Sequence, residues 1–137
     1  MLKKVLILGV VNLFLGLGLN MVLNVVFPQL SSEYQGSGLF RPWSDPLMSL
    51  YFAYPFIAGA VFIYLWGILG KSLKGDAWRR GFNFAKVYFL LATVPGMFIT
   101  YTSMKVSILM IATWMVIGFL EAYIGGWLLA NWDKKRA

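Results

Sequence analysis

Long stretches without ionisable side chains constrain this chain more than any other feature of its sequence. Four apolar segments with almost no charged residue run approximately over residues 5–27, 46–70, 82–101 and 106–130. Each is long enough for an α-helix to cross the roughly 30 Å hydrocarbon core of a bilayer. The sequence therefore predicts an all-α fold, in which residues 1–137 form a single domain, an integral-membrane four-helix bundle.

Composition supports a membrane protein and excludes several other classes. Hydrophobic residues make up 60% of the chain and charged residues 12%, whereas a soluble domain carries roughly 25% charged residues. The net charge of +7 does not indicate nucleic-acid binding, because the basic residues flank the apolar segments. The chain has no cysteine and no histidine, which excludes thiol nucleophiles, imidazole-ligated metals and haem. We expect no catalytic residue, no cofactor and no metal site.

The distribution of lysine and arginine predicts the orientation of the bundle. Ten basic residues flank the N-terminus, the connection between the second and third segments and the end of the fourth segment, whereas only Arg41 and Lys105 fall on the other side. Basic residues accumulate on the cytoplasmic side of membranes. We therefore expect both termini inside and a long outer loop between the first and second helices. The expected location is a cell membrane, and specifically the bacterial inner membrane.

The N-terminus also resembles a secretory signal peptide, because two lysines precede an apolar run. That run continues to Phe27, which is longer than the 7–15-residue apolar core of a signal peptide. We therefore expect the first helix to be retained in the mature protein.

Glu121 is the only acidic residue deep inside any of the four segments. It lies roughly 22 Å along the fourth helix at 1.5 Å per residue, which places it near the membrane midplane. A carboxylate at that depth costs at least about 2.5–3.5 kcal/mol, so it must be neutral, paired or in contact with water. Two interpretations remain open. Glu121 is either a proton-coupling or cation-binding site, or a hydrogen-bonded residue that holds helices together.

Three asparagines on one face of the first helix supply polar groups near the depth of Glu121. They either line a polar cavity or form hydrogen bonds between helices, and the second interpretation is favoured. A threonine adds a further polar group in the third helix. The candidate intramembrane site therefore consists of Glu121, Asn12, Asn20, Asn24 and Thr93.

The outer half of the bundle carries a second set of candidates. Pro55 and Pro95 each remove a backbone N–H, and kinks at one depth would open a pocket beneath the outer loop, although isolated kinks are the commoner outcome. The loop and the start of the second helix contribute an interfacial cluster, either a docking surface or a loop packed on the bundle. This candidate outer-face site consists of Arg41, Trp43, Asp45 and Tyr51.

Small residues recur at a spacing of four in the fourth helix, at Gly118, Ala122 and Gly126. Helices in a membrane associate through close packing, and small residues allow the backbones to approach. We expect this ridge to contact the first helix, which carries Gly9 and Gly16. A second copy of the chain is the alternative neighbour.

Two functional hypotheses follow. The leading one is a small, non-enzymatic accessory or scaffold-type subunit that acts through contacts with protein or lipid. The alternative is a proton- or cation-coupled transporter centred on Glu121 with Asn12 and Asn20. The expected partners are the lipid bilayer and either further copies of the chain or a larger membrane complex, with no nucleic acid. A water-accessible cavity at Glu121 would favour transport, whereas a dry, tightly packed Glu121 would favour a structural role.

Overall fold

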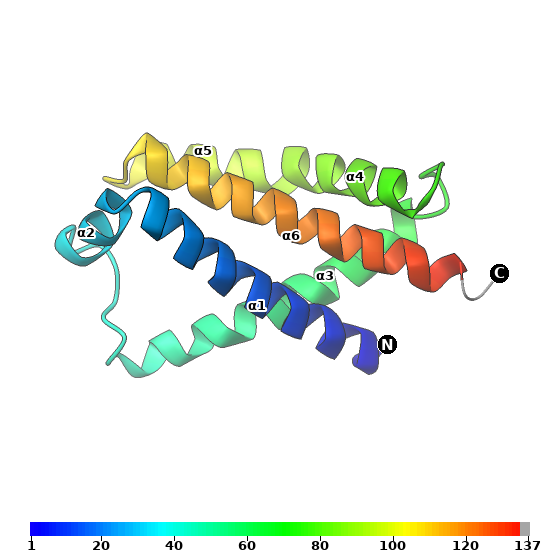
Figure 1. Ribbon diagram of the computed structural model, residues 1–137, viewed down its shortest axis with the longest axis horizontal. Coiled ribbons are helices and arrows are strands. Elements are labelled where there is room, and N and C mark those ends of the chain that lie inside the picture. The colour runs from blue at the N-terminus through cyan, green and yellow to red at the C-terminus, as the bar shows by residue number, and fades with distance from the viewer. Residues whose placement is uncertain (135–137) are drawn as a thin grey trace.

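A computed structural model describes residues 1–134 as helices joined by short connections (Figure 1). The elements are α1 (Leu2–Val26), α2 (Gln29–Gly36), η1 (Pro46–Ala53), α3 (Tyr54–Leu69), α4 (Ala77–Tyr88), η2 (Phe89–Thr93), α5 (Val94–Ser103) and α6 (Ile108–Lys134). They give four stretches long and apolar enough to cross a membrane: Leu2–Val26, Pro46–Leu69, Ala77–Ser103 and Ile108–Lys134. The predicted all-α fold is confirmed, with four helices that are long and apolar enough to span a membrane.

The bundle has two distinct ends (Figure 1). The N-terminus, the connection between α3 and α4 and the C-terminal end of α6 lie together at one end, whereas α2 and the connection between α5 and α6 lie at the other. We call the part of the bundle near the first end the terminal half. The part near the second end is called the α2 half.

The second span differs from the regular helix predicted over residues 46–70. Residues Pro46–Ala53 form a 3-10 helix, and the α-helix begins only at Tyr54, with Pro55 in its first turn. A proline has no N–H to donate, and its ring collides with the carbonyl one turn earlier. The chain meets this restriction by changing helix type before Pro55 instead of kinking a continuous α-helix.

The third span also departs from its predicted bounds of 82–101. It begins about one turn earlier, at Ala77, because the Asp76 carboxylate accepts a hydrogen bond from the Arg79 N–H at 2.9 Å and caps the helix. Its middle is the π-helical turn η2, which ends two residues before Pro95. A wider turn removes the need for a hydrogen bond from the proline.

The first and fourth spans differ from their predicted bounds, 5–27 and 106–130, mainly at their ends. The first begins at Leu2 and stops at Val26, just before Pro28. The fourth begins at Ile108 and continues to Lys134. Its start is set by Ser107, whose hydroxyl accepts a hydrogen bond from the Met110 N–H at 3.1 Å.

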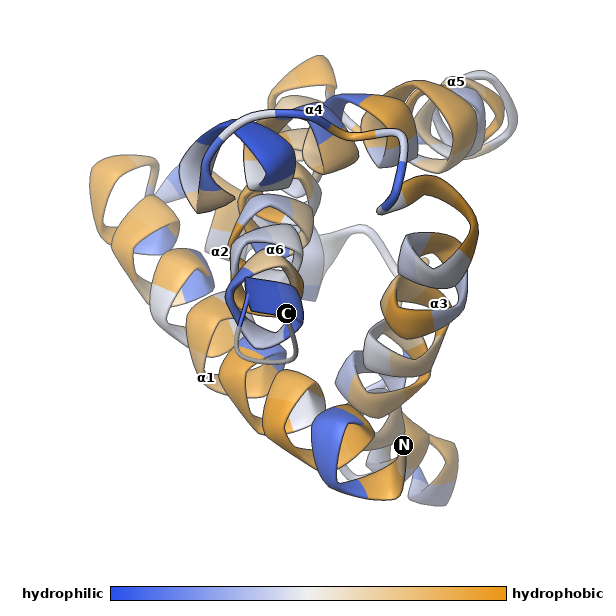
Figure 2. Ribbon diagram, turned by 90° about the vertical axis from the view of Figure 1, so that its right-hand side faces the viewer, coloured by the Kyte–Doolittle hydropathy of each residue, from blue (hydrophilic) through white to orange (hydrophobic). Residues whose placement is uncertain are grey.

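Helix α6 lies at the centre of the bundle, with α1, α3 and α4 around it. Figure 2 views the molecule from the terminal end and shows this arrangement. Many large hydrophobic side chains of the four spans are exposed, among them Phe14, Tyr64 and Phe98. Helix α6 packs along α4, and α1 packs along α3. The core of the terminal half is aromatic: Phe62 meets Phe84 edge to face at 5.8 Å, and both are almost fully buried. Outward apolar surface and a packed interior suit a bundle surrounded by lipid.

The small-residue ridge of α6 faces α4 and η2, so the expected contact with α1 is wrong. A Cβ atom added at Gly126 would lie 3.1 Å from the Gly81 Cα atom, and Ala122 is fully buried. The side chain nearest to Gly118 belongs to Thr93, at 3.7 Å. The reason is that α4 supplies a matching glycine, Gly81. The small residues of α1 have other neighbours: Gly9 lies against α3, and Gly16 lies against the Glu121 side chain.

A polar cluster joins three helices at the terminal end. The Asp133 carboxylate accepts hydrogen bonds from Trp66 Nε1 at 2.6 Å and from Arg80 Nη2 at 3.2 Å. Arg80 also donates to the carbonyl of Gly70 at 3.0 Å, and its guanidinium lies 4.9 Å from the centre of the Trp66 ring. The cluster ties α3, α4 and α6 together where their apolar core ends.

Candidate functional site

A cavity of about 800 Å³ occupies the centre of the α2 half. All four spans line it, together with α2 and the loop that follows α2. Its volume lies within the roughly 300–1,000 Å³ typical of small-molecule sites. It extends beneath the outer loop, where a pocket is predicted. Pro55 belongs to its lining, whereas Pro95 is exposed.

Glu121 lies at the floor of this cavity, and only 8% of its surface is exposed. Its carboxyl group points at α1 where that helix has no side chain: a Cβ atom at Gly16 would be 2.7 Å from Oε1. Among residues 1–134, no side chain forms an ion pair with it, and Lys86 in the third span lies over the Phe82 ring instead. The carboxyl group is thus buried, without a counter-charge and next to open space.

Asn12 lies one turn before Gly16 on the same face of α1 and also lines the cavity. Its side chain is fully buried, and neither its Nδ2 nor its Oδ1 atom has a hydrogen-bond partner within the described part of the chain. An unsatisfied buried polar group costs about 1–3 kcal/mol. Such a group indicates a position where a bound molecule or water completes the hydrogen bonds.

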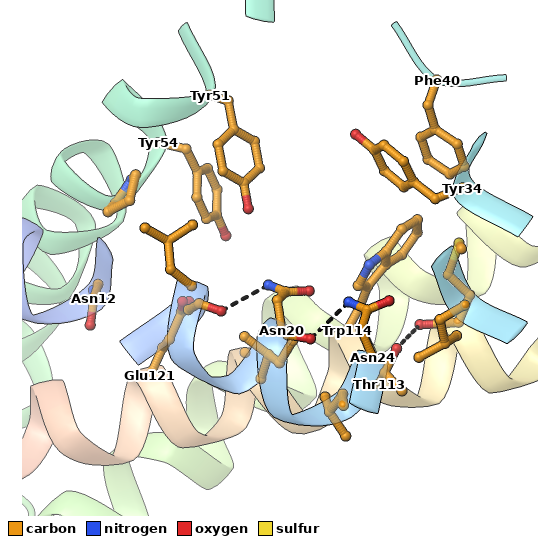
Figure 3. A pocket seen from close by; sticks show the side chains of 18 of the residues that line it. Asn12, Asn20, Asn24, Tyr34, Phe40, Tyr51, Tyr54, Thr113, Trp114 and Glu121 are labelled. Atoms are coloured by element: carbon orange, nitrogen blue, oxygen red, sulfur yellow. Dashed lines mark hydrogen bonds between the residues drawn. The ribbon is translucent and has the colours of Figure 1, made fainter. Parts of the chain in front are cut away.

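The other two asparagines form local hydrogen bonds, so the favoured interpretation of bonds between spans is wrong for their amide donors. Asn20 Nδ2 donates to the Gly16 carbonyl at 2.8 Å, and Asn24 Nδ2 donates to the Asn20 carbonyl at 2.7 Å. The carbonyl one turn earlier is simply the closest acceptor. Both side chains still line the cavity, which adds polar surface along α1 (Figure 3). Thr93 lines the cavity from the opposite side, in η2.

Aromatic rings form most of the remaining wall. Figure 3 shows the Tyr51 and Tyr54 hydroxyl groups directed into the space that Glu121 and Asn20 border from the other side. Phe40 stacks on Tyr34 at 4.4 Å and meets Trp114 edge to face at 6.1 Å. Eight aromatic residues line the cavity: Tyr34, Phe40, Trp43, Tyr51, Tyr54, Phe62, Tyr88 and Trp114.

The predicted outer-face residues lie at the mouth of the same cavity. Arg41, Trp43 and Tyr51 line it, and the Trp43 and Tyr51 rings meet edge to face at 5.6 Å. Asp45 pairs with Arg41 Nη1 at 2.9 Å and accepts a hydrogen bond from the Leu47 N–H at 2.9 Å. The Leu47 N–H and the Arg41 guanidinium hold the pKa of Asp45 below its usual value. Residues from two separately predicted sites therefore line one cavity.

Glu33 holds the roof of the cavity in place, a role that sequence reasoning missed. Its two carboxylate oxygens accept hydrogen bonds from the backbone N–H and the hydroxyl group of Ser107, both at 2.6 Å. These bonds fasten α2 to the start of α6. The sequence signal was an acidic residue in a loop opposite the first turn of the last helix, where a carboxylate is favourable.

Tyr54, Tyr88 and Thr113 also line the cavity and were not predicted. Tyrosine and threonine within apolar segments also occur as ordinary packing residues, so only the fold shows which of them face the cavity.

Comparison with models of protein families, with curated proteins and with solved structures finds no match. The function is therefore argued from the cavity itself.

Proposed function

We propose that this membrane protein is a small transporter that binds its ligand in the Glu121 cavity and couples movement of the ligand to protonation of Glu121. One observation carries the proposal: a cavity of about 800 Å³ reaches a buried carboxyl group that has no counter-charge among residues 1–134. Intramembrane acids of this kind commonly mark ion and substrate pathways.

The physical basis of coupling is that an unpaired carboxylate is costly inside a membrane. Two changes remove this cost. A proton neutralises the group, or a positively charged partner enters and pairs with it. Because the same carboxyl group serves both purposes, a proton and a cationic partner exclude one another. Such exclusion is the minimum requirement for exchange between them.

The two halves of the bundle suit access from one side at a time. The α2 half encloses the cavity, whereas the terminal half is closed by Phe62, Phe84 and the cluster around Asp133. The changes of helix type before Pro55 and before Pro95 interrupt the regular hydrogen bonding of two spans. These are the positions where we expect the bundle to bend when access alternates.

Orientation and location belong to the same proposal. The basic residues favour an orientation with the terminal half in the cytoplasm and the α2 half outside, and the membrane we expect is a bacterial inner membrane. The chain has no cysteine, so single cysteines at Ser37 and Gly75 report the topology cleanly. An impermeant thiol reagent added outside intact cells should label Ser37→Cys and not Gly75→Cys. The reverse result would invert the proposed orientation.

The accessory-subunit hypothesis loses one of its supports. A second copy of the chain was the alternative neighbour of the small-residue ridge, and α4 and η2 occupy that ridge within the chain. Contact with a further copy or with a larger complex stays a prediction that native purification would test.

Carbodiimide modification tests whether Glu121 exchanges protons. Dicyclohexylcarbodiimide is apolar and reacts with protonated carboxyl groups, so the purified protein in detergent should be modified at Glu121, increasingly as the pH falls. Mass spectrometry of peptides locates the adduct, and Glu121→Gln is the control that removes it. A Glu121 that stays unmodified, or one whose modification ignores pH, would contradict the proposed function and favour a sealed structural residue.

A further inference from the structure

We infer that the ligand of this cavity is an amphipathic organic cation, a protonated amine carried on an aromatic or aliphatic body. The inference rests on the proposed function, because it names the substrate class of the same site. It follows from three independent properties of the cavity: its charge, its unsatisfied hydrogen-bonding groups and its wall.

The charge of the cavity favours a cation. Only Glu121 and Arg41 carry formal charges among the described residues that line it. Arg41 is paired with Asp45 at 2.9 Å, so its charge is already compensated, whereas Glu121 is unpaired. The uncompensated charge is therefore a single negative one, at the floor.

The remaining titratable groups of the lining are phenols. They come from α2, η1, α3 and α4, whereas α1, η2 and α5 contribute none. These phenols are Tyr34, Tyr51, Tyr54 and Tyr88. Phenol groups supply hydrogen bonds and no positive charge, so nothing in this set attracts an anion.

The unsatisfied groups favour a cation with N–H bonds. The Glu121 carboxyl group lies against α1 at Gly16, and Asn12 lies one turn away on the same face of that helix. Residues four apart on a helix have Cβ atoms about 5–6 Å apart. An ammonium group that pairs with the carboxylate would lie close to the buried amide of Asn12, whose Oδ1 has no other donor among the described residues. The Nδ2 atom of Asn12 remains free to donate to a hydroxyl group or a water molecule.

The wall favours an organic body over a bare metal ion. A metal cation such as Ca²⁺ requires six or more oxygen ligands at 2.3–2.6 Å, and no group of three acidic or metal-binding residues occurs in residues 1–134. The cavity instead offers ample volume and rings such as Phe40 and Trp114. Aromatic faces attract cations and pack against apolar chains.

Three probes with one aromatic body and different head groups test this inference. They are 2-phenylethylammonium, 2-phenylethanol and 3-phenylpropionate, and equilibrium dialysis with the protein in detergent measures their binding at neutral pH. We expect the ammonium to bind at least about tenfold more tightly than the alcohol, since charge-assisted hydrogen bonds are the stronger ones. We expect the carboxylate to bind most weakly. An ammonium that binds no more tightly than the alcohol, or a carboxylate that binds best, overturns the inference.

Variants assign the preference to the named residues. Glu121→Gln should abolish the difference in affinity between the ammonium and the alcohol, whereas Glu121→Asp should keep most of that difference. Asp76→Asn removes a carboxylate far from the cavity and should leave the difference unchanged. Asn12→Leu should weaken binding of the ammonium probe and leave binding of tetraphenylphosphonium, a cation without N–H groups, unchanged. A preference for the ammonium that survives Glu121→Gln would place the cation elsewhere and contradict the inference.

Ammonium groups on an apolar body also occur in phospholipids. Adding phosphatidylethanolamine to the dialysis separates these sources: displacement of 2-phenylethylammonium identifies a lipid, and its persistence identifies a free amine. The carbodiimide result separates the two proposals. Modification of Glu121 without a binding preference for the ammonium would contradict only the proposed ligand class. An unreactive Glu121 would contradict the proposed function as well.

Discussion

The terminal half and the α2 half of this bundle are built from the same apolar residue types, yet one is closed and the other is hollow. In the terminal half, Phe84 and Ala85 are fully buried and helix backbones approach closely at Gly81 and Gly126. In the α2 half, four spans diverge around a cavity of about 800 Å³. Apolar composition places a helix in the membrane, but it does not determine how tightly the helices pack.

Small residues and prolines account for the difference. Glycine and alanine on facing helices let α4 and α6 pack without side chains between them. Near the other end, Pro55 and Pro95 accompany a 3-10 segment and a π turn, which change the direction of the backbone. The bulky aromatic side chains of the loop and of α3 then surround the space without filling it.

The largest effect is expected where the terminal half packs most closely. A Cβ atom at Gly81 would lie 2.7 Å from the backbone nitrogen of Trp127, so Gly81→Leu forces two backbones apart. Overpacking of this kind should cost about 3 kcal/mol or more. Thermal unfolding in detergent measures the loss, with Gly67→Leu as control because its added Cβ has no neighbour within 4 Å. Equal stability of the two variants would show that α4 and α6 are not in close contact.

Removal of the charge at Asp133 comes next. The guanidinium of Arg80 is mostly buried, and Asp133→Asn leaves it with weaker acceptors beside Trp66. Hydrogen bonds to charged groups contribute about 1.5–3 kcal/mol, so a loss of about 2 kcal/mol is expected. Chemical unfolding in detergent, followed by tryptophan fluorescence, measures this loss. The same assay on Arg80→Lys separates loss of charge from loss of geometry. An unfolding midpoint of Asp133→Asn equal to that of wild type would refute the role assigned to the cluster.

A smaller effect is expected in the roof of the α2 half. Glu33→Gln retains an acceptor for the Ser107 N–H and loses the charge, so we expect a cost of about 1 kcal/mol. Hydrogen exchange should increase in α2 and stay constant in α4. Faster exchange throughout the chain would mean that α2 is part of the same cooperative unit as the terminal half.

The smallest effect is expected at the mouth of the cavity. The Arg41–Asp45 pair is exposed, and such pairs contribute little to stability. Because the folded pKa of Asp45 is lowered, the contribution of Asp45 is complete above the unfolded pKa of about 4 and is lost as the pH falls through the folded value. Asp45→Asn should therefore match wild type in melting temperature at strongly acidic pH and fall slightly below it at neutral pH. A gap that widens on acidification would contradict this assignment.

Part of the architecture is readable in the sequence because it depends on local chemistry. Four apolar runs specify four spans, and Asp45 followed by Pro46 specifies the start of a helix. The neighbour of the Gly118–Gly126 ridge is not readable in this way, because it depends on Gly81 in another helix. The proline residues signal an irregularity, but whether it becomes a kink, a 3-10 segment or a π turn depends on tertiary packing.

The candidate site shows the same division. Glu121 stands out because an acid is rare at that depth, and the asparagine row identifies the polar face of α1. Arg41 and Trp43 share a cavity with Glu121 only because the loop that carries them folds over the bundle. The link between Glu33 and Ser107, which holds that loop, joins residues 74 positions apart in the chain.

We expect water and solutes to reach the face of α1 that carries Asn20. Asn20 lines the cavity, whereas the next residue, Met21, is 71% exposed on the outward surface of the helix. A charged thiol reagent added to Asn20→Cys and Met21→Cys in membranes distinguishes the two faces. We predict that Asn20→Cys reacts, faster with a cationic reagent than with an anionic one, and that Met21→Cys is shielded by lipid. An unreactive Asn20→Cys, or equal reaction at both positions, would contradict a solvent-accessible cavity between the helices.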